Sequence, residues 1–265
     1  MDMIKNQEGD LAISVDGALV TATLNRPAAR NAMTFEMYEN LADLCREIDA
    51  DHSIKALIIT GAGSQAFSSG TDISQFTVFE TEEDGWAYEE RMERVLSAIE
   101  SCRVPTIAAI SGACTGGGAA IAACCDIRIT TDTLKFGFPI ARTLGNCLSI
   151  ANYGRLVDLI GAARVKDLIF RARLVGSDEA LSIGLVTQVV SSHEELLLCA
   201  HEIAERIMQH APLTMQTCKT ALLRLREEGI AARDKDLIAT CYMSDDFREG
   251  MTAFLEKRAP NWTGR

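Results

Sequence analysis

The first two thirds of the chain alternate between short apolar runs and longer amphipathic stretches. Residues 11–24 alternate apolar and polar side chains around Asp16-Gly17, a pattern that predicts a β-hairpin. Residues 55–61 and 104–112 are nearly continuous apolar runs, which predict two buried strands. Longer stretches of helical period separate these runs, so strands and helices are expected to alternate.

Two helices are predicted between these strands. Thr34 can cap a helix that continues to about Ala50, because its hydroxyl can accept a hydrogen bond from the first helical turn. Residues 80–102 are acidic at first and amphipathic later, which predicts a second helix. Residues 25–34 and 61–72 are rich in turn-forming residues and are predicted as loops.

The last third of the chain is mainly helical. Strands are still predicted at residues 126–132 and 134–139, the second one short and followed by a turn. From about Ser149 the pattern is helical, with breaks at residues 174–180 and 184–190.

The tail, residues 193–258, predicts two or three long helices. An α/β fold with a helical C-terminal extension is therefore expected. We place the α/β core at residues 1–195 and the helical region at residues 196–265.

Composition fits a globular protein, and the charge disfavours one class of partner. The chain is 48% hydrophobic and 24% charged, with a formal net charge of −11. An acidic chain repels a phosphate backbone, so no nucleic-acid partner is expected. The chain has no run of 18 apolar residues and no apolar signal region at its start, so we expect a cytoplasmic protein without a membrane partner.

The nine cysteines are an odd number and form no CxxC pair. We interpret them as small buried hydrophobic residues in a reducing cytoplasm, with metal binding or a reactive thiol as the alternatives. Residues 201–205, HEIAE, look like half of a zinc motif but end in glutamate, so no metal is expected.

Two glycine-containing turns carry the chemistry that this chain suggests. Residues 111–118, SGACTGGG, lie between a predicted strand and a helix, and residues 67–73, FSSGTDI, also follow a strand. Free N–H groups at a helix N-terminus stabilise negative charge. The alternative is that the glycines serve only tight packing. Two such turns after neighbouring strands could aim two N–H groups at one point, which is an oxyanion hole.

Five segments, in order and over nearly the whole chain, resemble the crotonase family of enoyl-CoA hydratases and isomerases. The resemblance implies a crotonase-like spiral of ββα units, with the C-terminal helical region used for trimerisation. It implies a homotrimer or a hexamer made of two trimers. It also implies an acyl-CoA substrate and no separate cofactor, since coenzyme A is part of the substrate. The matching segments are residues 24–33, 56–73, 104–129, 136–139 and 245–262.

The resemblance assigns the thioester site to backbone groups. The N–H of Thr71 and the N–H of Gly117 would hold the thioester oxygen and stabilise an enolate. Coenzyme A would lie beside two segments of the chain. Lys257 or Arg258 could reach one of its phosphates, either within the same chain or from a neighbouring subunit. The residues assigned to coenzyme A are Arg26, Ala28, Arg30, Ser69, Thr71, Asp72, Ile73 and Lys257.

The chain departs from the family at both glutamates that its hydratases use. Ala120 stands three residues after the middle glycine, and Ile140 stands just after the FGFP motif. The two carboxylates of a hydratase orient a water and transfer its proton, which alanine and isoleucine cannot do. Hydration of a 2-enoyl thioester by the usual mechanism is therefore not expected.

Other polar residues near the predicted pocket could act instead. Asn146 could donate to a substrate oxygen or only cap a loop, and Arg142 could bind a second carboxylate or form a surface or interface salt bridge. The acidic residues 80–84, with Tyr88, could reach the pocket or could simply start a helix.

Three functions stay open on the sequence. The first is an enzyme acting on enoyl-CoA or another acyl-CoA with an unusual acid or base. The second is a decarboxylase or hydrolase of the same fold, which an Arg142 facing the pocket would favour. The third is a subunit that binds acyl-CoA without catalysis.

Overall fold

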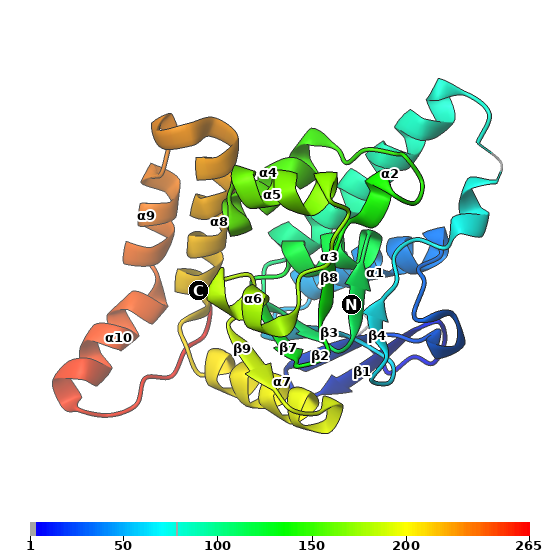
Figure 1. Ribbon diagram of the computed structural model, residues 1–265. Helices are drawn as coiled ribbons and strands as arrows, with labels where there is room; N and C mark the ends of the chain where they lie inside the picture. The colour runs from blue at the N-terminus through cyan, green and yellow to red at the C-terminus, as the bar shows by residue number, and fades with distance from the viewer. Residues whose placement is uncertain (1–3, 78) are drawn as a thin grey trace.

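The computed structural model describes residues 4–77 and 79–265 and contains a large, mostly parallel β-sheet (Figure 1). Its strand order is β1-β2-β3-β5-β7-β9, and only the β1–β2 pair is antiparallel. The predicted hairpin is confirmed: Asp16 pairs with Leu19, and Gly17 turns the chain with a φ of +57°. The strands are Leu11–Asp16 (β1), Leu19–Leu24 (β2), Ala56–Gly61 (β3), Thr106–Ile110 (β5), Ile127–Thr131 (β7) and Gln188–Val190 (β9).

A second sheet of three short parallel strands gives the fold its repeat. Its order is β4-β6-β8, with Ala66–Ser68 (β4), Ala113–Thr115 (β6) and Lys135–Gly137 (β8). Each unit places one strand in the large sheet, the next in the small sheet, and then a helix: β3-β4-α2, β5-β6-α3 and β7-β8-α4. The predicted α/β class with ββα units is confirmed.

Helices cover both faces of the large sheet and extend beyond it (Figure 1). The tail contains four helices, α7 to α10, so the prediction of two or three was wrong. Single turns of 3₁₀ helix occur at Pro27–Ala29 (η1), Ile73–Phe76 (η2), Pro139–Ala141 (η3) and Gly229–Ala231 (η4). The α-helices are Phe35–Ala50 (α1), Glu82–Ser101 (α2), Gly117–Cys124 (α3), Ile150–Ile160 (α4), Ala162–Phe170 (α5), Ser177–Ser182 (α6), His193–Met208 (α7), Pro212–Glu228 (α8), Lys235–Tyr242 (α9) and Asp245–Glu256 (α10).

The apolar strand runs are explained by burial on both faces of the large sheet. Leu57 and Ile59 of β3 pack in the main core, whereas Ile58 packs in a second cluster with residues of α7. Successive side chains of a strand point to opposite faces, so a strand covered on both sides must be apolar throughout. A division of the chain after residue 195 would cut α7, which contacts β3, β5 and β7.

Local capping occurs where the sequence predicted it. Thr34 starts α1, and its Oγ1 accepts a hydrogen bond from the N–H of Met37 at 3.2 Å. Thr81 and Asp84 form a reciprocal capping box at the start of α2. Hydrogen bonds from the N–H of Glu80 and then from Thr81 hold the pKa of Asp84 below its usual value. The acidic start of this helix therefore caps it.

Three short strands escaped prediction. The predicted loop at residues 61–72 contains β4, and the glycine-rich turn at residues 111–118 contains β6, both of them strands of the small sheet. The apolar break at 184–190 contains β9, the last strand of the large sheet. Each spans only three residues, which is too short for a period-2 pattern to emerge.

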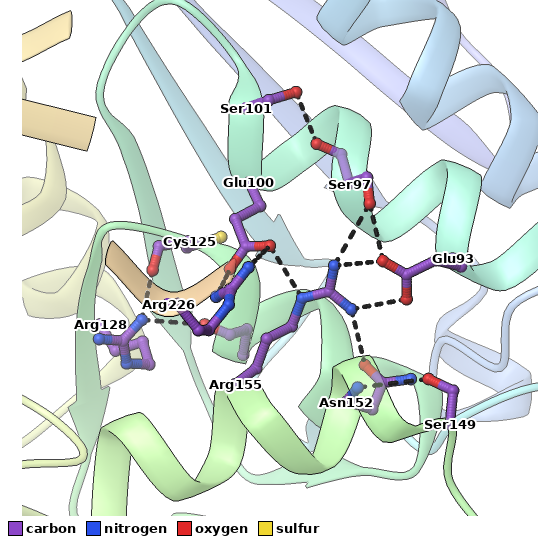
Figure 2. A network of polar contacts seen from close by, with 11 residues as sticks. Glu93, Ser97, Glu100, Ser101, Cys125, Arg128, Ser149, Asn152, Arg155 and Arg226 are labelled. Atoms are coloured by element: carbon purple, nitrogen blue, oxygen red, sulfur yellow. Dashed lines mark hydrogen bonds and ion pairs between the residues drawn. The ribbon is translucent and has the colours of Figure 1, made fainter. Parts of the chain in front are cut away.

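A partly buried cluster of four charges, centred on the buried Arg155, joins α2, α4 and α8 (Figure 2). Arg155 of α4 is 2% exposed and donates two hydrogen bonds to Glu93, at 2.7 and 2.9 Å, and one to Glu100 at 2.9 Å. Arg226 of α8 donates to the same Glu100 at 2.5 and 2.8 Å. Burial opposes the ionisation of Glu93, but hydrogen bonds from Arg155 and Ser97 outweigh it and lower the Glu93 pKa.

Replacement of Arg155 should show how much this cluster contributes to the stability of the protein. Arg155→Met would remove the main partner of Glu93, which is 36% exposed, while Arg226 would still pair with Glu100. The free energy of unfolding should therefore fall by about 1–3 kcal/mol. Urea denaturation followed by circular dichroism measures this change.

The matched control is Arg171→Met, because Arg171 is 70% exposed and pairs with Asp167 one helical turn away. Its effect should stay below about 1 kcal/mol. Equal effects of the two substitutions would contradict a dominant role for the Arg155 cluster.

Candidate active site

A cavity of about 200 Å³ opens where the two glycine-containing turns meet. The turn after β4 contributes Gly70 and Thr71, and the turn between β6 and α3 contributes Gly116 and Gly117. The remaining walls come from η2, α2, α3, η3, the loop that follows η3, and α4. The fold therefore brings together two turns that are more than 40 residues apart in the sequence.

Glycine allows these two turns to approach each other. Gly70 has a φ of +105°, and a Cβ on it would lie 3.1 Å from the carbonyl oxygen of Thr115 and 3.5 Å from the nitrogen of Gly117. Gly116, directly before α3, has a φ of +54°. Both positions combine a left-handed backbone with a close neighbouring backbone, which only glycine accepts without strain.

Two further glycines of the run are required by packing. A Cβ on Gly117 would overlap the hydroxyl of Tyr38, and a Cβ on Gly118 would lie 2.6 Å from the Cβ of Ser68. The packing interpretation of these glycines therefore holds at the same time as any role of their N–H groups.

Thr71 and Gly117 both line this cavity. The backbone around Thr71 is fixed by Met33, whose N–H donates to the carbonyl oxygen of Gly70 and whose own oxygen accepts from the N–H of Asp72, both at 2.8 Å. Within residues 4–77 and 79–265, neither the Thr71 nor the Gly117 N–H donates to a protein acceptor. Gly117 is the first residue of α3, so the helix dipole adds to the positive potential there.

Two tyrosines hold the Thr71 side chain. Its Oγ1 lies 3.0 Å from the hydroxyl of Tyr38 and 3.1 Å from that of Tyr88. Burial raises the pKa of both tyrosines above the usual value, so both hydroxyls stay protonated at neutral pH. Tyr88 in turn packs on Phe76, with ring centroids 4.9 Å apart. The position of Thr71 is therefore fixed through backbone and side chain together.

The two positions that lack glutamate lie in the cavity wall. Ala120 is 5% exposed and Ile140 is 7% exposed, and both line the cavity. Asn146 also lines it, with only a 3.5 Å contact from its Nδ2 to the carbonyl oxygen of Cys147. Arg142 is exposed and is not among the lining residues.

The cavity also holds two polar side chains that sequence reasoning missed. Glu89 of α2 is half-buried, and burial, followed by the charge of Glu93, raises its pKa above the usual value. Asn152 of α4 is nearly fully buried, and its Oδ1 accepts a hydrogen bond from Arg155 at 3.2 Å. Both residues belong to helices that the charge cluster joins.

Comparison with known proteins decides the family. The family model described as enoyl-CoA hydratase/isomerase matches residues 15–265. The chain belongs to the enoyl-CoA hydratase/isomerase family. It is 35% identical to the short-chain-enoyl-CoA hydratase of Clostridium acetobutylicum, over 94% of this chain and 95% of that one. It is 34% identical to the crotonyl-CoA hydratase of Syntrophomonas wolfei, over 97% and 98% of the two chains.

The fold is that of this family. The crystal structure of an enoyl-CoA hydratase/carnithine racemase from Magnetospirillum magneticum superposes with a TM-score of 0.89. It is 33% identical, and the match covers 98% of this chain and 97% of that one. The crotonase-like architecture expected from the sequence is therefore confirmed.

The two segments expected to bind coenzyme A lie side by side. The N–H of Ser69 donates to the carbonyl oxygen of Arg30 at 3.0 Å, and Arg26 donates to Asp72 at 3.0 Å. Asp72 caps η2 through Ser74, and hydrogen bonds from Ser74 and then Arg26 lower the Asp72 pKa. Most of the remaining expected residues are exposed near this junction, namely Ala28, Arg30, Ser69 and Ile73.

Lys257 lies elsewhere in the chain. It follows the last residue of α10, and Figure 1 shows α10 at the lower left edge of the molecule, beyond α9. Within this chain Lys257 is therefore apart from the segments around Arg26 and Ser69. A contact with coenzyme A from this residue would need a neighbouring subunit, which stays a prediction.

The described residues contain neither a candidate metal site nor a helix suited to a membrane. No group of three or more His, Cys, Asp or Glu side chains among them is arranged to hold a metal ion. No helix in the described part of the chain combines the length and apolarity needed to span a bilayer.

Gly117→Ala tests the packing of the glycine turn. The new Cβ would collide with the Tyr38 hydroxyl, so the free energy of unfolding should fall by about 1–3 kcal/mol. Tyr38→Phe removes that hydroxyl, so the double variant should recover part of the loss, with a coupling of about 0.5 kcal/mol or more in a double-mutant cycle.

Gly85→Ala is the matched control, since a Cβ on Gly85 would meet no atom within 4 Å in helix α2. It should stabilise the protein by about 0.5–1 kcal/mol. Strictly additive effects of Gly117→Ala and Tyr38→Phe would show that the collision does not occur.

Proposed function

We propose that this chain is an acyl-CoA enzyme in which the N–H groups of Thr71 and Gly117 hold the thioester oxygen and stabilise an enolate. One observation carries the proposal: Thr71 and Gly117 both line one cavity, and among the described residues neither backbone N–H has a protein acceptor. Donors fixed in place before the reaction stabilise developing charge without a reorganisation penalty. Family membership and relatives named as enoyl-CoA hydratases support an acyl-CoA substrate.

Coenzyme A would lie along the junction of residues 26–30 and 69–73. The backbone contact between Ser69 and Arg30 brings these segments together, and Arg30 supplies an exposed positive charge there. Arg26 is already paired with Asp72, so its charge is partly neutralised. Substrate binding as a thioester explains why no separate cofactor is proposed.

The reaction should differ from two-glutamate hydration. Ala120 and Ile140 give the cavity apolar walls where a hydratase of this family has carboxylates, and a water there has few partners. An Arg142 facing the cavity would have favoured the alternative of a decarboxylase or hydrolase, and the exposed position of Arg142 outside the lining removes that support. A trimer or hexamer stays a prediction; Phe254 and Leu255 of α10, 84% and 80% exposed, are apolar surface that such an assembly would cover.

A conjugated thioester tests the oxyanion hole directly. On binding of 2,4-hexadienoyl-CoA, two hydrogen bonds to the thioester oxygen should draw electron density toward it and shift the absorbance to longer wavelength. A difference spectrum measures the shift, and free coenzyme A should reverse it by competition. Saturable binding without any shift would place the thioester oxygen away from these N–H groups.

Introducing glutamate at positions 120 and 140 tests whether two carboxylates are what the site lacks for hydration. We expect the wild-type chain to hydrate crotonyl-CoA far more slowly than roughly 1 per second, and Ala120→Glu/Ile140→Glu to gain hydration because both positions line the cavity. Loss of the conjugated-thioester absorbance measures the rate. The single variants serve as controls, and wild-type hydration at 1 per second or faster would contradict the expectation.

A further inference from the structure

The cavity contains one acidic side chain. Among the described residues that line it, Glu89 is the only one with a carboxyl group, and none is lysine, arginine or histidine. The other polar groups are hydroxyls, amides and one thiol. A proton acceptor for carbon chemistry at neutral pH therefore has to be sought first at Glu89.

Glu89 occupies an apolar position of its helix. It lies three residues before Met92 and seven before Leu96, and all three line the cavity from α2. Positions i, i+3 and i+7 share one helix face, and Met92 and Leu96 are buried there. A carboxyl group in this stripe opposes burial, so it contributes nothing to stability that an apolar side chain would not supply better.

The carboxyl group of Glu89 is left out of the nearby charge cluster. The guanidinium of Arg155 donates to Glu93, Glu100, Asn152 and Ser97. No cation within the described residues lies within salt-bridge distance of Glu89. Burial and the charge of Glu93 raise its pKa, which makes the carboxylate a stronger base than an exposed glutamate.

We propose that Glu89 is the catalytic base of this site, removing and returning a proton next to the thioester carbonyl. The proposal rests on the function proposed above, because the enolate needs the two N–H groups. In the step, the C2–H bond breaks and an O–H bond forms on Glu89, while the electron pair moves onto the thioester oxygen. Return of the proton to C2 restores the substrate, and return to C4 of a 3-enoyl thioester gives the 2-enoyl isomer.

The carboxylate of Glu89 has no charged neighbour among the described residues that line the cavity. Ala120 of α3 and Ile140 of η3 contribute no charge to the cavity, so Glu89 meets no second carboxylate there that would repel it. The base would then act from α2, whereas the two family glutamates would have come from α3 and from the residue after FGFP. One carboxylate that shuttles a proton suits exchange or isomerisation better than addition of water.

Proton exchange in D₂O with 3-butenoyl-CoA tests the assignment. The wild-type protein should introduce deuterium at C2 of the recovered thioester and at C4 of any crotonyl-CoA formed, as mass spectrometry measures. Glu89→Gln should lower both rates by about 100-fold or more. Glu90→Gln is the matched control, since Glu90 is the exposed next residue of the same helix, and it should leave both rates unchanged.

Glu89→Met separates a catalytic role from a structural one. Methionine suits the apolar stripe, so this variant should unfold at a higher temperature than the wild type while losing exchange. A residue needed only for structure would instead make the protein less stable when replaced. Glu89→Met also tests the proposal should Glu89→Gln fail to fold.

The absorbance shift with 2,4-hexadienoyl-CoA keeps the two proposals apart. A shift in the wild type and in both Glu89 variants, with exchange lost only in the variants, supports the assignment. Wild-type exchange rates in either Glu89 variant would overturn it, and so would a wild-type protein that gives the shift but exchanges no proton. A wild-type protein that binds without a shift would overturn the proposed function, and with it the role of Glu89.

Discussion

The candidate site depends on how closely two backbone segments approach each other. The turn after β4 and the turn before α3 meet at Gly70, where a Cβ would already press on the oxygen of Thr115. Parallel strands bring these turns to the same edge, because β4 and β6 are neighbours in the small sheet. A larger side chain at Gly70 would push the turns apart and separate the N–H groups of Thr71 and Gly117.

This arrangement divides the chemical work between backbone and side chains. In the proposed mechanism, charge stabilisation would rest with peptide N–H groups, which every residue but proline carries. It would therefore not depend on the side chains at positions 120 and 140, which are alanine and isoleucine here. Proton transfer needs a side chain, and it can be supplied from a different element without moving the turns. Such a division would explain how one fold could keep a thioester site and change its reaction.

The sequence predicted the features that repeat a pattern over enough residues. The hairpin, α1, β3 and β5 follow from period or composition, and both glycine turns were located by their position after strands. Strands of three residues, such as β4 and β9, are held by pairing with distant segments, which local pattern does not contain.

Single side chains were harder to place than elements. Tyr38 lies on the apolar face of α1, so nothing in the sequence distinguishes it from a core residue, although its hydroxyl contacts Thr71. Glu89 did leave a signal, since a charged residue shares a helix face with Met92 and Leu96. That signal lies on the otherwise apolar face of the helix, whereas the acidic residues considered in the sequence analysis lie at the start of the helix. The roles of the site residues stay predictions.

The charge cluster also links the cavity to the outside of the molecule. Arg226 faces inward from α8 and holds Glu100, while Leu222 and Leu225 of the same helix are 62% and 51% exposed. The cluster continues through Arg155 to Asn152 in the cavity wall. If a molecule on the outer face of α8 and a ligand in the cavity both favoured the same arrangement of these charges, their binding would be thermodynamically coupled. By reciprocity, each would then strengthen the binding of the other by the same factor.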